Sequence, residues 1–223
     1  MKKLIVLFVA LTVLSLHQVF PQNFKVQLPP GYNKISMTEE FPGKEGSPYL
    51  LNEWLPGTII LANGTKIEGL TYRYLVYRKE MQYKKENTAY AIGAPDSIKA
   101  LWMDKRLFVY HTFMNESKND KDFFEILVDG KAKLLIRYVT KIIPANYNKA
   151  LDVGNKNDQI TIIETYYVQK ENELPVFIDK KGKSITAALA DKTEEIKKFT
   201  DKEHISFKNK EDLVRVVSYY NGL

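Results

Sequence analysis

The sequence has no cysteine and only three histidines among its 223 residues. The lack of cysteine excludes disulfides, thiol nucleophiles and metal sites built on thiolates. Beyond the N-terminal region, the histidines are His111 and His204, which lie in distant segments and beside no serine-nucleophile motif. There is also no glycine-rich phosphate loop and no dinucleotide-binding fingerprint. The sequence therefore assigns no catalytic residue, and we expect no metal and no cofactor.

The N-terminus has the pattern of a secretory signal peptide. Lys2 and Lys3 precede an apolar run from Leu4 to Leu16, which is shorter than the roughly 18–20 apolar residues of a membrane-spanning helix. We therefore expect residues 1–21 to be a signal peptide. The mature protein would then be exported, to the periplasm, to the outer membrane as an associated protein, or to the outside of the cell.

The charge of the chain does not favour a nucleic-acid partner. The whole chain has a formal net charge of +6, and the loss of two lysines with residues 1–21 leaves 31 basic and 27 acidic residues, or +4. The lysines are spread along the chain rather than clustered, which is typical of a solvated surface. We expect no nucleic-acid binding.

Periodicity divides the remaining chain into three parts. Residues 22–50 have little periodicity and contain several Pro-Gly breaks, so we expect an extended N-terminal arm. Residues 51–180 contain about ten short runs of β-forming residues separated by turn signals, as in sandwiches and barrels. The sequence thus predicts a mainly β fold, either an antiparallel β-sandwich or a partly open barrel of about ten strands.

Two dipeptides predict hairpins within the β-rich region. A type I′ turn at Asn63-Gly64 needs positive φ at both residues and would place Ile60 across from Ile67. Asp129-Gly130 predicts a second two-residue turn. In that register the expected pairs are Leu127 with Ala132 and Phe123 with Ile136.

The period changes to that of helices in residues 181–223. Asp191 begins a capping-box pattern, Asn209 is expected to cap the last helix, and apolar residues follow it in one stripe. Helices this short are unstable alone. We therefore expect a small helical C-terminal cap that is docked on the β domain.

Four segments of the chain carry a resemblance to a known family. They are GTIILANG at residues 57–64, GLTYRY at 69–74, FFEILVDG at 123–130, and EDLV at 211–214 followed by YYN at 219–221. With these motifs, residues 49–223 resemble an uncharacterised family of exported and envelope proteins of the Bacteroidetes group. The resemblance implies a location in the envelope or outside the cell. It implies no known activity and carries over no catalytic residue.

Tyrosines and basic residues are interleaved between residues 72 and 90. Strand alternation separates Tyr72, Tyr74 and Val76 from Arg73, Leu75 and Tyr77, so only one of these two sets can face the core. Because an unpaired guanidinium is costly to bury, we assign the set with Arg73 to the outside. Lys84 joins this face if the next strand pairs in register. We therefore predict an interaction face made by Arg73, Tyr77 and Lys84, since Tyr and Arg are enriched in interface hot spots and also stack on sugars.

Carboxylates leave a second class of function open. Glycosidases act through paired carboxylates and need neither histidine nor metal. Alternation directs Glu125 inward, where desolvation would raise its pKa. The other acidic residues of suitable type are Glu39, Glu40, Asp120, Asp122 and Asp129.

The sequence thus leads to a functional hypothesis with one alternative. The hypothesis is an exported, non-enzymatic envelope or secreted protein whose β domain binds another protein or a glycan, with peripheral association with the outer membrane. The alternative is a carboxylate-dependent hydrolase of the glycosidase type. A partly buried acidic pair that faces a cleft would favour the hydrolase, and a flat aromatic and basic face without a cleft would favour binding.

Overall fold

The computed structural model describes residues 33–34, 44–171 and 173–223. The predicted signal peptide, residues 1–21, and most of the predicted arm, residues 22–50, lie outside these described residues. No helix within the described ranges is long and apolar enough to cross a lipid bilayer.

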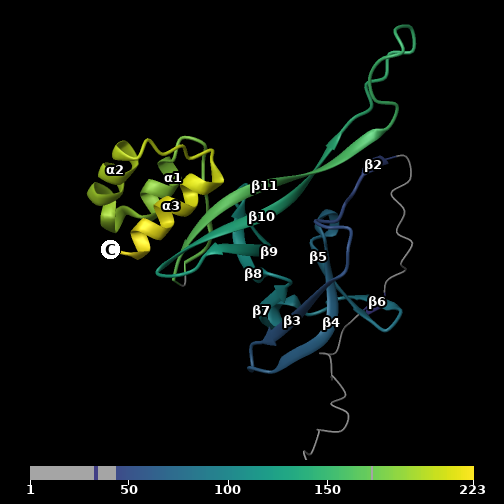
Figure 1. Ribbon diagram of the computed structural model, residues 1–223, viewed down its shortest axis with the longest axis horizontal. Coiled ribbons are helices and arrows are strands. Elements are labelled where there is room, and N and C mark those ends of the chain that lie inside the picture. The colour runs from purple at the N-terminus through teal and green to yellow at the C-terminus, as the bar shows by residue number, and fades with distance from the viewer. Residues whose placement is uncertain (1–32, 35–43, 172) are drawn as a thin grey trace, which may run out of the picture.

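Twelve strands in the described part form one sheet (Figure 1). The order is β1-β6-β5-β4-β3-β7-β8-β9-β10-β11-β12, with β2 paired in parallel to β11 and the other pairs antiparallel. The strands are β1 (Asn33–Lys34), β2 (Lys44–Gly46), β3 (Leu55–Leu61), β4 (Lys66–Leu75), β5 (Glu80–Lys85), β6 (Thr88–Ala91), β7 (Ile98–Met103), β8 (Arg106–Asn115), β9 (Lys118–Val128), β10 (Ala132–Ile143), β11 (Asp158–Lys170) and β12 (Val176–Phe177). The predicted mainly β fold with a helical C-terminal cap is confirmed, and the strands form a single sheet that is not closed.

The sheet curls strongly, so that strands that are distant in the strand order pack side chains into one core. Tyr74 on β4 lies edge-on to Phe108 on β8 and to Phe123 on β9, with ring centroids 6.1 and 5.8 Å apart. In the sheet order, β3 and β7 stand between β4 and β8. All three rings are buried. The inward orientation predicted for Tyr74 is therefore confirmed.

The first hairpin has a loop one residue longer than predicted. Leu61 donates its N–H to the carbonyl of Thr65, and Gly64 donates to the carbonyl of Leu61, each at 2.9 Å. Gly64 has φ of +84°, whereas Asn63 is not in the left-handed region, so the turn is not of type I′. The predicted pair of Ile60 with Ile67 is wrong. Ile59 pairs with Ile67 instead, and both are buried.

The second hairpin also differs from the predicted register. The predicted pairs of Leu127 with Ala132 and of Phe123 with Ile136 are wrong. The observed pairs between β9 and β10 are Val128 with Leu134, Ile126 with Leu135, Glu125 with Ile136 and Phe124 with Arg137.

A contact from the C-terminal helix explains this shift at the end of the hairpin. The side-chain oxygen of Asn221 accepts a hydrogen bond from the N–H of Ala132 at 2.8 Å, and its amide nitrogen donates to the Ala132 carbonyl at 2.9 Å. Asn221 therefore satisfies the backbone groups that a neighbouring strand would otherwise bond. The N–H and the carbonyl of Ala132 are therefore satisfied without the pairing to β9 that a two-residue turn would give.

Three helices cover one face of β9, β10 and β11 and form the cap (Figure 1). They are α1 (Lys183–Ala188), α2 (Thr193–Lys202) and α3 (Lys210–Asn221), and the short 3₁₀ helices are η1 (Val76–Arg78), η2 (Pro95–Ser97) and η3 (Ala190–Lys192). Asn209 caps α3 as predicted, because its side chain accepts a hydrogen bond from the N–H of Asp212 at 3.1 Å. The capping role predicted for Asp191 is wrong, since Lys192 is the N-cap residue of α2 and makes no side-chain cap bond. Asp191 instead points to the end of the sheet.

The two longest strands extend beyond the rest of the sheet. β10 and β11 pair from Ala132 with Lys170 to Ile143 with Gln159, whereas β9 accompanies β10 only as far as Arg137. Residues 138–164 therefore form a β10–β11 ribbon, with β2 beside residues 158–160. Its base, at Tyr138, is part of the core, and its outer part projects from the body. Figure 1 shows this ribbon leaving the body of the protein and ending in a loop, residues 144–157, which we call the ribbon tip.

Replacing Gly64 with valine tests the assignment of the first hairpin. No atom lies within 4 Å of a Cβ at this position, so the cost is that of the backbone conformation alone. We expect a loss of about 1–3 kcal/mol in the free energy of unfolding. Urea denaturation followed by circular dichroism measures it. Gly64→Asn should cost less, because asparagine tolerates the left-handed region better. Equal stability of Gly64→Val and the wild type would contradict the turn.

Candidate functional site

The residues of the predicted interaction face lie partly on one side of the sheet. Lys84 on β5 pairs with Thr71 on β4, and Arg73 pairs with Gln82, so Arg73 and Lys84 share the face opposite to Tyr74. Tyr77 follows the end of β4, in η1, and its side chain is 45% exposed. The structure therefore brings Arg73 and Lys84 together on one face and places Tyr77 at its edge.

Other side chains of the chain contact Arg73 on this face. The guanidinium carbon lies 3.6 Å from the ring centroid of Tyr49 and 4.5 Å from that of Trp54, and Nη2 donates to Gln82 at 3.2 Å. Burial lowers the pKa of Arg73 from its usual value. Leu75, which was assigned to the outside, is fully buried, and the backbone of Tyr49 pairs with it in an isolated bridge. The aromatic segment before β3 therefore covers much of this face, and a partner-binding role for it stays a prediction.

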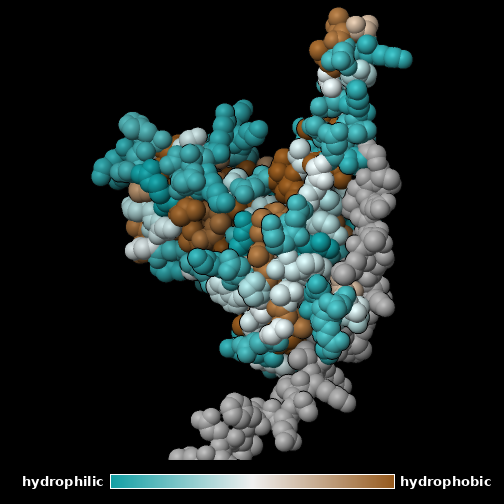
Figure 2. All heavy atoms as spheres, turned by 45° about the vertical axis from the view of Figure 1, so that its right-hand side comes forward, coloured by the Kyte–Doolittle hydropathy of each residue, from teal (hydrophilic) through white to brown (hydrophobic). Residues whose placement is uncertain are grey.

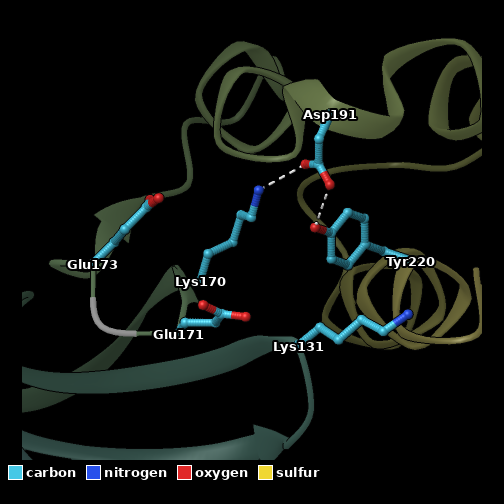
Figure 3. A pocket seen from close by; sticks show the side chains of 6 residues that line it. All are labelled: Lys131, Lys170, Glu171, Glu173, Asp191 and Tyr220. Carbon is cyan, nitrogen blue, oxygen red and sulfur yellow. Dashed lines mark hydrogen bonds and ion pairs between the residues drawn. The ribbon is translucent and has the colours of Figure 1, made fainter.

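A polar pocket lies where the helical cap meets the end of the β10–β11 pair (Figure 3). It has a volume of about 520 Å³, which is within the range of small-ligand sites. We call it the cap pocket. Its lining residues are Lys131 from the β9–β10 turn, Lys170 from the end of β11, Glu171 and Glu173 from the turn that follows, Asp191 from η3, and Tyr220 from α3.

Three of these side chains hold one another in place. Lys170 Nζ lies 2.7 Å from an oxygen of Asp191, and the Tyr220 hydroxyl donates to the other oxygen at 2.8 Å (Figure 3). The hydrogen bond from Lys170 holds the pKa of Asp191 below its usual value, and the same bond raises the pKa of Lys170. The buried Tyr220 and the ion pair with Lys170 thus hold the Asp191 carboxylate in place at one wall of the pocket.

The other three side chains have no partner of their own. Within the described ranges, the ammonium of Lys131 and the carboxylates of Glu171 and Glu173 make no hydrogen bond or ion pair, although all three line the cap pocket. Each is exposed to solvent. The pocket thus offers free groups of both signs to a ligand.

A second hollow continues from the cap pocket. Its volume is about 310 Å³, and Glu171 and Glu173 belong to the lining of both hollows. Its remaining lining residues are His111, Thr112, Gln169, Leu174 and Pro175. Burial lowers the pKa of His111, so at neutral pH its imidazole is uncharged. The turn between β11 and β12 therefore lies between a hollow lined by charges of both signs and one lined by the two glutamates without a lysine or arginine.

The acidic residues considered for hydrolysis are engaged elsewhere. Asp122 is fully buried and accepts hydrogen bonds from Tyr74 and Arg137, while Asp120 is bonded to Lys79 at 2.5 Å. Glu125 is buried, as predicted, and accepts a bond from the Tyr138 hydroxyl at 2.5 Å. Asp129 pairs with Lys133, and Glu39 and Glu40 lie outside the described residues. None of the four described carboxylates lines the cap pocket or the second hollow.

The described residues contain no group of three histidine or acidic side chains arranged to hold a metal ion. Comparison with known proteins gives no further information about the function of this site. No family model matches the chain, and no similar curated protein or solved structure was found.

Sequence reasoning did not find the cap pocket. Its residues come from four segments between positions 131 and 220. Five of them look like ordinary charged surface residues in isolation, and Tyr220 belongs to the apolar stripe of the last helix. Asp191 was interpreted as a helix cap. One feature of the sequence could have pointed to the pocket. Lys170 is followed closely by two glutamates, Glu171 and Glu173, at the end of a long strand.

Replacing Arg73 with serine distinguishes a structural role from a free binding role. The change removes the stack on Tyr49 and Trp54 and the bond to Gln82, so we expect the free energy of unfolding to fall by about 1–3 kcal/mol. Lys84→Ser is the matched control, since Lys84 lies on the same face without a side-chain partner in the described ranges. Its effect should stay within about 0.5 kcal/mol. Equal melting temperatures for the two variants would show that the aromatic stack does not stabilise the fold.

Proposed function

We propose that this chain is a non-enzymatic glycan-binding protein of the cell envelope or the cell exterior. The observation that carries the proposal is the set of free charges around the cap pocket. The ammonium of Lys131 and the carboxylates of Glu171 and Glu173 border a volume of about 520 Å³ without partners in the described part. Free polar groups that converge on one hollow are what fix the orientation of a polar ligand.

The chemistry of the lining favours a particular class of glycan. Lys131 and Lys170 donate hydrogen bonds to carboxylates and hydroxyls, whereas Glu171 and Glu173 accept them from hydroxyls and amino groups. A glycan that carries both carboxylate and amino groups uses both sets. Fragments of peptidoglycan have this composition, and a neutral sugar would leave the charges uncompensated.

The second hollow supports a ligand longer than one sugar unit. Because Glu171 and Glu173 line both hollows, a chain of sugar units can cross the turn that carries them. Leu174, which is 45% exposed, and Pro175 offer apolar surface to the face of a sugar ring. A compact small molecule would fill only one of the two hollows.

The environment of Asp191 in the cap pocket favours binding over hydrolysis. A general acid at neutral pH needs a raised pKa, but Lys170 lowers the pKa of Asp191. The Asp191 carboxylate is also occupied by Lys170 and Tyr220. Asp191 is therefore suited to orient neighbouring donors rather than to transfer a proton.

Titration calorimetry with soluble oligosaccharides tests the proposal. The probes are a muropeptide with both charge signs, acidic oligogalacturonate and neutral chitotetraose. We expect the muropeptide to bind most tightly, and the double variant Lys131→Ala/Glu173→Gln to weaken it at least tenfold, or about 1.4 kcal/mol.

The control variant is Lys66→Ala, which removes an exposed lysine from β4, away from both hollows. It should bind the muropeptide like the wild type. Failure of all three probes to bind would contradict the proposal. Binding of the muropeptide by the double variant with the affinity of the wild type would contradict it too. Cleavage of a bound oligosaccharide would support the hydrolase alternative instead.

A further inference from the structure

The ribbon tip presents the most exposed large hydrophobic side chains of the described residues. Leu151 is 69% exposed and Val153 is 55% exposed. Figure 2 shows hydrophobic atoms at the far end of the projecting ribbon, well away from the body. At the base of the tip, Ile142 and Ile143 are also 40% and 37% exposed. Apolar surface at the extremity of a protein contributes nothing to its own core.

The tip is an ordered structure. Asn148 exchanges backbone hydrogen bonds with Val153, and its side-chain oxygen accepts from the N–H groups of Ala150 and Leu151 at 3.0 and 3.3 Å. Gly154 has φ of +95°, and a Cβ there would lie 2.5 Å from the carbonyl oxygen of Asn146. The backbone therefore holds Leu151 and Val153 in fixed outward positions.

The charges around the tip match an anionic surface. Residues 144–157 contain Lys149, Lys156 and one acid, Asp152, for a net charge of +1. The Tyr147 hydroxyl donates to Asp152 at 2.6 Å, and Lys156 lies 4.7 Å from the Tyr147 ring centroid. The Asp152 carboxylate thus has a hydrogen-bond donor within the tip, whereas Lys149 has no side-chain partner in the described part.

The shape and residue types favour a lipid surface over a protein partner. Hot spots between proteins are enriched in Trp, Tyr and Arg, and Leu and Val are under-represented there. A protruding pair of aliphatic side chains needs a groove in a protein, but it can enter the acyl boundary of a bilayer directly. Lysines and a tyrosine next to such a pair suit the headgroup layer.

We propose that the ribbon tip inserts Leu151 and Val153 into the surface of an anionic lipid bilayer, with Lys149 and Lys156 at the phosphates. This contact is peripheral and reversible, because two aliphatic side chains bury little apolar area. It is separate from the cap pocket, so each proposal can fail without the other.

The absence of cysteine allows a site-specific test on the full chain. Leu151→Cys carries a single nitrobenzoxadiazole label, and Met114→Cys, at a position 49% exposed on β8 and outside both hollows, carries the matched control label. Both proteins are mixed with vesicles of phosphatidylcholine and phosphatidylglycerol at 7:3. We expect a blue shift and at least a twofold intensity rise at position 151 and neither at 114. Equal responses at the two positions, or none at 151, would overturn the proposal.

Unlabelled variants test the same contact by vesicle flotation. Leu151→Ser/Val153→Ser should lower the bound fraction at least fivefold, while Met114→Ser/Val176→Ser, which removes two apolar groups of the body that are 49% and 39% exposed, should change it less than twofold. Lys149→Gln/Lys156→Gln should weaken binding to the anionic vesicles and leave binding to pure phosphatidylcholine unchanged. Wild-type levels of binding by the Leu151→Ser/Val153→Ser variant would also overturn the proposal, as would a protein crosslinked at position 151 without any lipid response.

Discussion

A fully buried carboxylate, that of Asp122 on β9, joins the two sides of the curled sheet. It accepts a hydrogen bond from the Tyr74 hydroxyl at 2.6 Å and one from Arg137 Nε at 2.8 Å. Tyr74 belongs to β4, which three strands separate from β9 in the sheet, so this bond links strands that share no backbone ladder. Burial raises the pKa of Asp122, and both donors act against that shift. Since an uncompensated buried charge is costly, the sheet must keep its curvature to keep this carboxylate satisfied.

The same network extends to the segment that carries the candidate site. The guanidinium of Arg137 lies 4.5 Å from the ring centroid of Phe113, and Phe113 is edge-on to Tyr167 at 5.8 Å. Tyr167 in turn contacts Phe177 of β12, with centroids 5.6 Å apart. β12 ends the turn that begins with Glu171, so these contacts fix where Glu171 and the second hollow lie. The position of the proposed glycan site therefore depends on the packing that Asp122 and Arg137 organise.

Local signals predicted the class of the fold but not its registers or its site. Alternation and turn dipeptides are local, and they correctly indicated a mainly β chain with a helical cap. The registers depend on one left-handed residue at Gly64 and on a contact from Asn221, 89 residues from Ala132, which no local pattern contains. The environment of Arg73 was missed for the same reason, because its covering rings, Tyr49 and Trp54, precede β3 and no local pattern pairs them with β4. The cap pocket was missed because its charged residues become neighbours only when the cap docks.

A double-mutant cycle on Tyr74 and Asp122 tests most directly whether this contact holds the curled sheet. Tyr74→Phe keeps the ring and removes the hydroxyl, and Asp122→Asn keeps the shape and removes the charge. Unfolding free energies of the wild type, both single variants and the double variant come from urea titrations. We expect each single change to destabilise the fold and the two to couple by about 1–2 kcal/mol, the strength of a buried hydrogen bond to a charged group. Additive effects, with coupling below about 0.3 kcal/mol, would show that the two sides of the sheet are held together without this bond.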